Sequence, residues 1–116
     1  ITPFKNGVID EVSYRKLIKN QINSGIHGLT PCGTTGETST LDENEYVKVV
    51  EIAIEEAEKN IPIIAGAGTN STLKTIKTAK LAENLGSDAV LIVAPYYNKP
   101  TQTGIYEHYK AISESI

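Results

Sequence analysis

The sequence of 116 residues has little of what several protein classes require. It contains one cysteine, two histidines, and no methionine or tryptophan. A single cysteine cannot form an internal disulfide or a structural zinc site, and neither His27 nor His108 has other ligand residues at metal-binding spacing around it. We therefore expect no metal site, and a reducing compartment, the cytoplasm, as the location.

Long apolar runs and basic clusters are also missing. Without 18 consecutive apolar residues or a charged-then-apolar leader, the sequence predicts neither a membrane span nor a signal peptide. Its 11 Lys and Arg against 14 Asp and Glu give a net charge of −3. We expect a soluble protein that binds neither membrane nor nucleic acid. The missing initial methionine, and residues 111–116 that resemble uncapped helix, lead us to interpret the sequence as an excerpt.

Helical and apolar segments alternate along the chain. Candidate helix N-caps recur about every 30 residues, the size of one βα unit. They are Asp10, Asp42, Ser71 or Thr72, and Thr101, and Asp42 with Glu45 has the spacing of a capping box. The segments between the helices are 26–31, 61–65 and 89–94, and the last two are apolar without alternation, as in parallel strands covered on both faces.

This alternation predicts one α/β domain over residues 1–116. Two architectures fit it: an open doubly wound sheet, or roughly the first half, about four βα units, of a (β/α)8 TIM barrel. In either one, functional loops follow the C-terminal ends of the strands, and three loops qualify: 32–38, 66–70 and 95–100.

The first loop places Thr34 and Thr35 between two glycines. Its outward amides and hydroxyls could hold a carboxylate or a phosphate, and a plain tight turn explains the pattern as well. A nucleotide-binding P-loop is disfavoured because no lysine follows the second glycine.

The other two loops also leave alternatives open. Gly66-x-Gly68 is reminiscent of a dinucleotide fingerprint, yet Ser71 replaces the third glycine and Asp88 precedes the next strand, so a plain turn is favoured. In the third loop Tyr96 and Tyr97 suit proton transfer or carboxylate binding, and interface packing suits them equally.

For the other reactive side chains the sequence predicts no catalytic role. Cys32 is expected to be a small buried filler, His27 a structural residue and His108 a surface residue. No lysine lies inside an apolar strand, where desolvation would favour a neutral amine. An enzyme that used a Schiff base would therefore carry its lysine outside residues 1–116.

Four motifs in register resemble a known family over the whole chain: Ile-Thr-Pro-Phe at 1–4, Gly-Thr-Thr-Gly-Glu at 33–37, Ala-Gly-Ala-Gly at 65–68 and Ala-Pro-Tyr-Tyr-Asn-Lys-Pro at 94–100. They are similar to the 4-hydroxy-tetrahydrodipicolinate synthases, also called dihydrodipicolinate synthases. The resemblance implies a cytoplasmic lyase with a (β/α)8 barrel and no cofactor. In this family pyruvate forms a Schiff base with a lysine, and its enamine attacks L-aspartate 4-semialdehyde on the route to diaminopimelate and lysine.

The resemblance also implies roles for single residues. Thr34 and Tyr97 match the hydroxyls of the family's proton relay, and Thr35 matches the residue that binds the pyruvate carboxylate. Tyr97 is implied to reach the neighbouring subunit's site, so a homodimer, or a tetramer of two dimers, is expected. The family's Schiff-base lysine and a further catalytic tyrosine fall outside residues 1–116, so this stretch alone is expected to be inactive.

Regulation and identity leave further alternatives. Lysine-sensitive relatives are implied to have histidine at Tyr46 and glutamate at Lys74, whereas Asn70 and Tyr96 match their inhibitor site. We therefore expect weak feedback inhibition by lysine. The alternatives are an N-acetylneuraminate lyase-like or other pyruvate-dependent class I aldolase, and a non-catalytic half-barrel.

Overall fold

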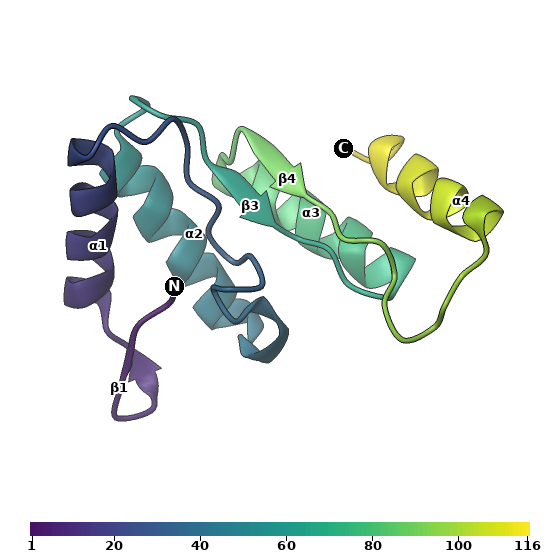
Figure 1. Ribbon diagram of the computed structural model, residues 1–116, viewed down its shortest axis with the longest axis horizontal. Coiled ribbons are helices and arrows are strands. Elements are labelled where there is room, and N and C mark those ends of the chain that lie inside the picture. Colours follow the sequence, from purple (N-terminus) through teal and green to yellow (C-terminus); the bar gives the residue numbers. More distant parts are fainter.

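A computed structural model describes all residues from 1 to 116. The molecule measures 42 × 32 × 23 Å, and its first and last helices lie toward opposite ends of the long axis (Figure 1). The elements in chain order are strands β1 (Phe4–Lys5) and β2 (Val8–Ile9), helix α1 (Glu11–Asn23), the 3-10 helix η1 (Thr38–Thr40), α2 (Glu43–Ala57), β3 (Ile64–Gly66), α3 (Thr72–Leu85), β4 (Ala89–Leu91) and α4 (Gln102–Ser113).

Three parallel segments, each followed by a helix, form the centre of the fold. β3 pairs with β4 in parallel, with Ala65 opposite Val90. The segment around Leu29 extends this arrangement: its N–H donates to Pro62 O at 3.0 Å, and Ile64 N–H donates to its carbonyl at 2.9 Å. Neighbours in the sequence are therefore neighbours in space, as expected of successive βα units.

The predicted helix starts are confirmed. Asp10, Asp42, Ser71 and Thr101 each accept a hydrogen bond from the backbone amide three residues on, and Asp42 and Glu45 form a complete capping box. A cap of this kind stabilises a helix by about 1 kcal/mol. At the other end of the chain α4 stops at Ser113, because Glu114 and Ser115 close it with turn hydrogen bonds. The interpretation of residues 111–116 as continuous helix is wrong for the last three.

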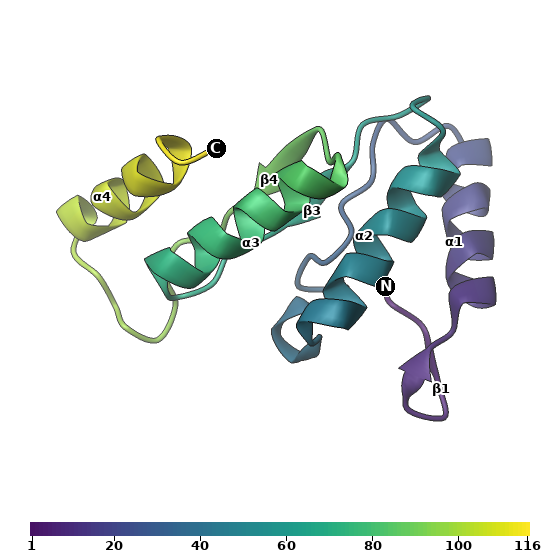
Figure 2. The same ribbon diagram turned by 180° about the vertical axis from the view of Figure 1, so that it is seen from behind.

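The hydrophobic core is concentrated on one side of the strands. A cluster of 12 buried residues joins α1, α2 and β3, and contains the fully buried Val49, Val50 and Ala65. A second cluster of 3 residues joins α3 and α4 around Ala79 and Ile112. α3 lies in front of β3 and β4 in one view and behind them in the other, so it covers one face of this sheet (Figures 1 and 2).

One face of β4 is open, which corrects for this strand the prediction that both faces are covered. Along β4 and its continuation, Val90 and Ile92 pack against the helices, whereas Leu91 and Val93 are 52% and 47% exposed. Alternate side chains of a strand point to opposite faces. The continuous apolar pattern of 89–94 therefore belongs to a strand that has only one of its faces covered in this structure.

The N-terminal hairpin was not predicted from the sequence. β1 and β2 are antiparallel and joined by Asn6-Gly7, both at positive φ. Asn-Gly is the strongest short signal of a two-residue hairpin turn. Before it, residues 1–3 pair with no strand. None of the four helices has the length and apolarity that crossing a bilayer demands.

Candidate active site

Backbone packing shapes the loop that carries Thr34 and Thr35. Cys32 has a left-handed φ of 56°, and Gly36 N–H donates to Gly33 O at 3.0 Å, so the chain turns sharply after the buried Pro31. The turn rests on Gly66 of β3, where a Cβ atom would lie 1.9 Å from the Cys32 carbonyl oxygen. A glycine at position 66 is therefore explained by packing, because a neighbouring backbone approaches it too closely to leave room for a side chain.

Gly68 likewise allows a neighbouring backbone to approach closely, that of the segment leading into the third loop. A Cβ atom there would lie 2.4 Å from the Val93 backbone nitrogen. The two glycines of Gly66-x-Gly68 thus let the backbones on either side approach the end of β3. This is the plain-turn interpretation of the motif, with a specific steric cause.

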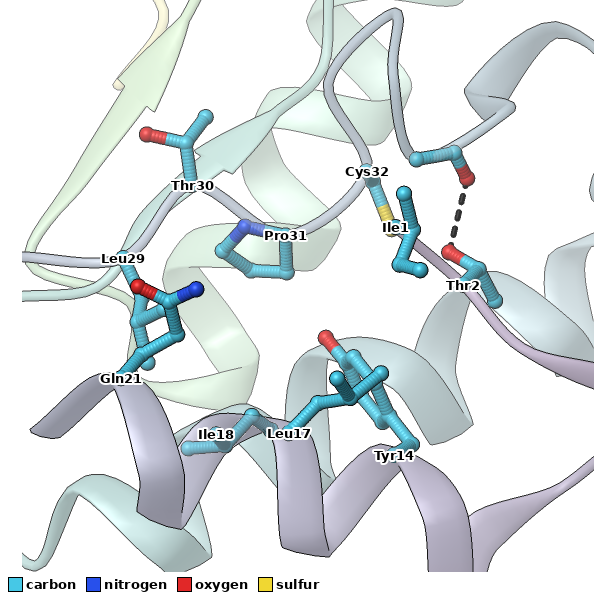
Figure 3. A pocket seen from close by; sticks show the side chains of 11 residues that line it. Ile1, Thr2, Tyr14, Leu17, Ile18, Gln21, Leu29, Thr30, Pro31 and Cys32 are labelled. Carbon is cyan, nitrogen blue, oxygen red and sulfur yellow. Dashed lines mark hydrogen bonds between the residues drawn. The ribbon is translucent and has the colours of Figure 1, made fainter.

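The N-terminal residues tie down the first loop. Thr2 is 4% exposed, and its hydroxyl donates to Gly36 O at 2.7 Å (Figure 3). Figure 3 shows Cys32 in the same pocket, between α1 and the parallel segment, with the Tyr14 side chain directed toward it. Burial raises the pKa of the Cys32 thiol to about 12, and Cys32 is 1% exposed. The prediction that Cys32 is a buried filler is confirmed.

Residues of all three predicted loops line one cavity. Its volume is about 650 Å³, and Thr34, Gly68 and Tyr96 represent one loop each. The three loops thus meet at one cavity through these residues. Helices α2 and α3 add Tyr46 and Lys74 to the wall. The Tyr46 hydroxyl is buried without a hydrogen-bond partner, and burial, then the nearby Cys32, raises its pKa.

Thr35 and Tyr97 do not line this cavity. Thr35 is exposed, and Tyr97 is 91% exposed, the largest value among the exposed large hydrophobic residues. The hydroxyls of Thr34, Thr35 and Tyr97 make no hydrogen bond within the chain, and Tyr97 has a φ of 68°. A bulky residue held in this backbone region costs about 1–3 kcal/mol, and such strain concentrates at functional sites.

The burial of the two histidines differs from what the sequence predicted. His108 is not on the surface: it is 3% exposed between α3 and α4, and its Nδ1 lies 2.9 Å from the Thr72 hydroxyl. The error arose because the polar neighbours of His108 in the sequence suggested a solvated face, whereas α4 turns this residue onto α3. His27 is exposed, which does not support its predicted structural role.

Residues 1–116 match, from end to end, the model of the dihydrodipicolinate synthetase family. The chain belongs to this family. A 4-hydroxy-tetrahydrodipicolinate synthase of Bradyrhizobium diazoefficiens is 56% identical over the whole chain, which covers 39% of that protein. Another, of Thermodesulfovibrio yellowstonii, is 57% identical over 98% of the chain and 39% of its own length.

Solved structures of dihydrodipicolinate synthases superpose closely. The enzyme of Thermotoga maritima has a TM-score of 0.99 and 52% identity, and the match covers the whole chain and 39% of that protein. The chloride-inhibited enzyme of Acinetobacter baumannii, complexed with pyruvate, has a TM-score of 0.96 and 49% identity over 99% of this chain and 40% of its own. The fold is therefore α/β and forms part of a (β/α)8 TIM barrel, and the chain spans about two fifths of the length of these relatives.

The pairing of Asn70 with Asn98 was not predicted from the sequence. Asn70, after β3, and Asn98, after β4, are joined by hydrogen bonds between their loops. The signal available was weak, because a single asparagine in a strand-end loop is typical of turns in general.

Proposed function

We propose that this sequence works within a full-length enzyme, a chain of the relatives' length that contains residues 1–116. That enzyme condenses pyruvate with L-aspartate 4-semialdehyde through a Schiff base and forms 4-hydroxy-tetrahydrodipicolinate. The proposal rests on the family membership and on relatives named for this activity. The observation that carries it is the meeting of Thr34 with the third loop at one cavity beyond the strand ends. The single cysteine of residues 1–116 is a free buried thiol, in keeping with a cytoplasmic enzyme.

The hydroxyl groups suit the chemistry that this reaction needs. Schiff-base formation and enamine formation both move protons, and a relay group must donate one proton while it accepts another. The hydroxyls of Thr34 and Tyr97 meet this condition, and both are free of internal partners. We assign the relay to these two residues and the binding of the pyruvate carboxylate to Thr35, in a loop with a sharply turned backbone.

Substitutions in the full-length enzyme test these roles. We expect Thr34→Val and Tyr97→Phe each to lower kcat by about 100-fold or more, because each removes one proton-transfer step. Thr35→Val should raise the KM for pyruvate. Matched controls are Thr103→Val and Tyr106→Phe, which remove exposed hydroxyls from α4. Full kcat in both Thr34→Val and Tyr97→Phe would contradict the assignment.

The exposure of Tyr97 supports a role in a second subunit, in a homodimer or a tetramer of two dimers. We expect inactive Thr34→Val and inactive Tyr97→Phe subunits to restore activity when they are unfolded together and refolded as hybrids. In a hybrid dimer, one site has both hydroxyls if Tyr97 crosses to the neighbour. Hybrids without activity would contradict a shared site.

Borohydride trapping separates this enzyme from its alternatives. Reduction in the presence of pyruvate should leave one modified lysine on the full-length enzyme and no adduct on residues 1–116 alone. An assay with aspartate semialdehyde, run against pyruvate plus N-acetylmannosamine, distinguishes the synthase from an N-acetylneuraminate lyase-like aldolase. Adduct on the short chain would contradict the lysine's location, and its absence on the long chain would favour a non-catalytic module.

We also infer that L-lysine inhibits the full-length enzyme weakly. Lys74 lines the cavity and makes no ion pair, so its ammonium group repels that of the ligand. Of the nearby carboxylates, Glu43 pairs with Lys77 and Asp42 caps α2. We expect calorimetry to detect only weak lysine binding, and Lys74→Glu to tighten it. Tight inhibition of the unmodified enzyme would overturn this inference.

A further inference from the structure

The turn that presents Tyr97 has a rare backbone form. Asn98 N–H donates to Tyr96 O at 2.8 Å, so three residues close the turn, and the central residue, Tyr97, has a φ of 68°. This is the γ-turn with positive φ, which is uncommon and strained. An L-residue stays in such a conformation only where its surroundings impose it.

Asn98 supplies the restraint. Asn70 Nδ2 donates to Asn98 Oδ1 at 3.1 Å, and Asn98 Nδ2 donates to the Asn70 backbone carbonyl at 2.9 Å. These are the only side-chain hydrogen bonds that residues 95–100 make. The residue whose N–H closes the γ-turn is therefore also the one whose side chain fastens this segment to the neighbouring loop.

The position of Asn70 is fixed because the residues on both sides of it are held by hydrogen bonds. Thr69 N–H donates to Oγ1 of the fully buried Thr75 at 2.9 Å, and Ser71 is the N-cap of α3. Farther along the chain, the contact between His108 and Thr72 ties α4 to the same end of α3. The connection from β4 to α4 is thus attached to the loop before α3, and α4 itself to the first residue of α3.

We propose that Asn98, held by Asn70, is the positioning residue that sets the location of the Tyr97 hydroxyl. This inference rests on the proposed function, in which that hydroxyl relays a proton. Asn98 touches no reacting atom: it acts through the turn. Proton transfer requires the oxygen to lie within hydrogen-bond reach of its partner, so a turn free to relax loses rate even though the tyrosine is intact.

Two alanine variants of the full-length enzyme remove the pair from either side. We expect Asn98→Ala and Asn70→Ala each to lower kcat by about 10- to 100-fold and to leave the KM for pyruvate unchanged. Asn98→Asp keeps the acceptor for Asn70 Nδ2 and loses the donor, so its kcat should fall less. Asn84→Ala is the control, because Asn84 is exposed on α3 and makes no side-chain hydrogen bond. Thermal melting shows whether each variant is folded.

The decisive measurement is the double variant Asn98→Ala with Tyr97→Phe. If Asn98 acts through the Tyr97 hydroxyl, this variant has the kcat of Tyr97→Phe alone. Effects that multiply, or full kcat in folded Asn98→Ala and Asn70→Ala, would overturn the positioning role while the relay stands. Full kcat in Tyr97→Phe would instead overturn the relay, and the positioning role with it.

Discussion

The two loops that carry Thr34 and Tyr97 are held in different ways. The first is fixed by backbone against backbone, with Cys32 packed onto Gly66 and Gly36 bound by the hydroxyl of Thr2. The loop around Tyr97 is fixed by one pair of asparagine side chains and is otherwise exposed. The first loop belongs to the large core cluster, whereas the second leads to the helix of the small one.

In the proposed site, this difference combines a rigid loop with an adjustable one. A loop held by steric exclusion between buried backbones can move only if the core moves. A loop held by two exposed side-chain hydrogen bonds has weaker restraint, because water competes for the same donors and acceptors. Substitutions near the first loop should therefore change stability, and those near the second should change catalysis.

The largest expected effect is on the reactivity of Cys32 in the full-length enzyme. Burial raises its pKa from 9.0 to about 12, so at pH 8 the thiolate population is lower by about 1000-fold. Mass spectrometry after alkylation should detect little modification of Cys32 in the native protein and rapid modification in urea. The rate at which Cys32 is alkylated in the native protein should keep rising with pH above 9. A plateau near pH 9 would show that the first loop opens freely.

Adding one methyl group at Gly66 should have the largest effect on stability. Gly66→Ala places a Cβ atom 1.9 Å from the Cys32 carbonyl oxygen, so the two backbones must separate. We expect the free energy of unfolding, measured by urea denaturation, to fall by about 3 kcal/mol. The control is Gly33→Ala, because the nearest atom to a Cβ there is 3.8 Å away. Equal stability of the two variants would contradict the steric account.

A smaller effect is expected at the other attachment of the first loop. Thr2→Val keeps the shape of the side chain but leaves the buried carbonyl of Gly36 without its donor. The free energy of unfolding should fall by about 2 kcal/mol. Thr2→Ser retains the hydroxyl and should lower the free energy of unfolding much less. If serine and valine destabilise equally, packing and not the hydrogen bond attaches the N-terminal residues.

Much of the fold follows from local sequence. The N-caps and the capping box of Asp42 were predicted because a cap depends on residues three or four positions apart. The hairpin at Asn6-Gly7 carried an equally local signal and was overlooked. The burial of His108 was mispredicted because it depends on how α4 packs against α3, which lies outside any local window.

For the candidate site, the sequence by itself determined which residues follow the strand ends, since alternating βα segments bring those ends to one edge. Only the tertiary structure decided that Gly66 is needed for the approach of Cys32, and that Asn70 and Asn98 bind each other across 28 positions. The physical reason is the sequence separation between the residues that interact. Caps and turns arise within a few residues, whereas close backbone approach and paired side chains exist only after separate segments have packed together.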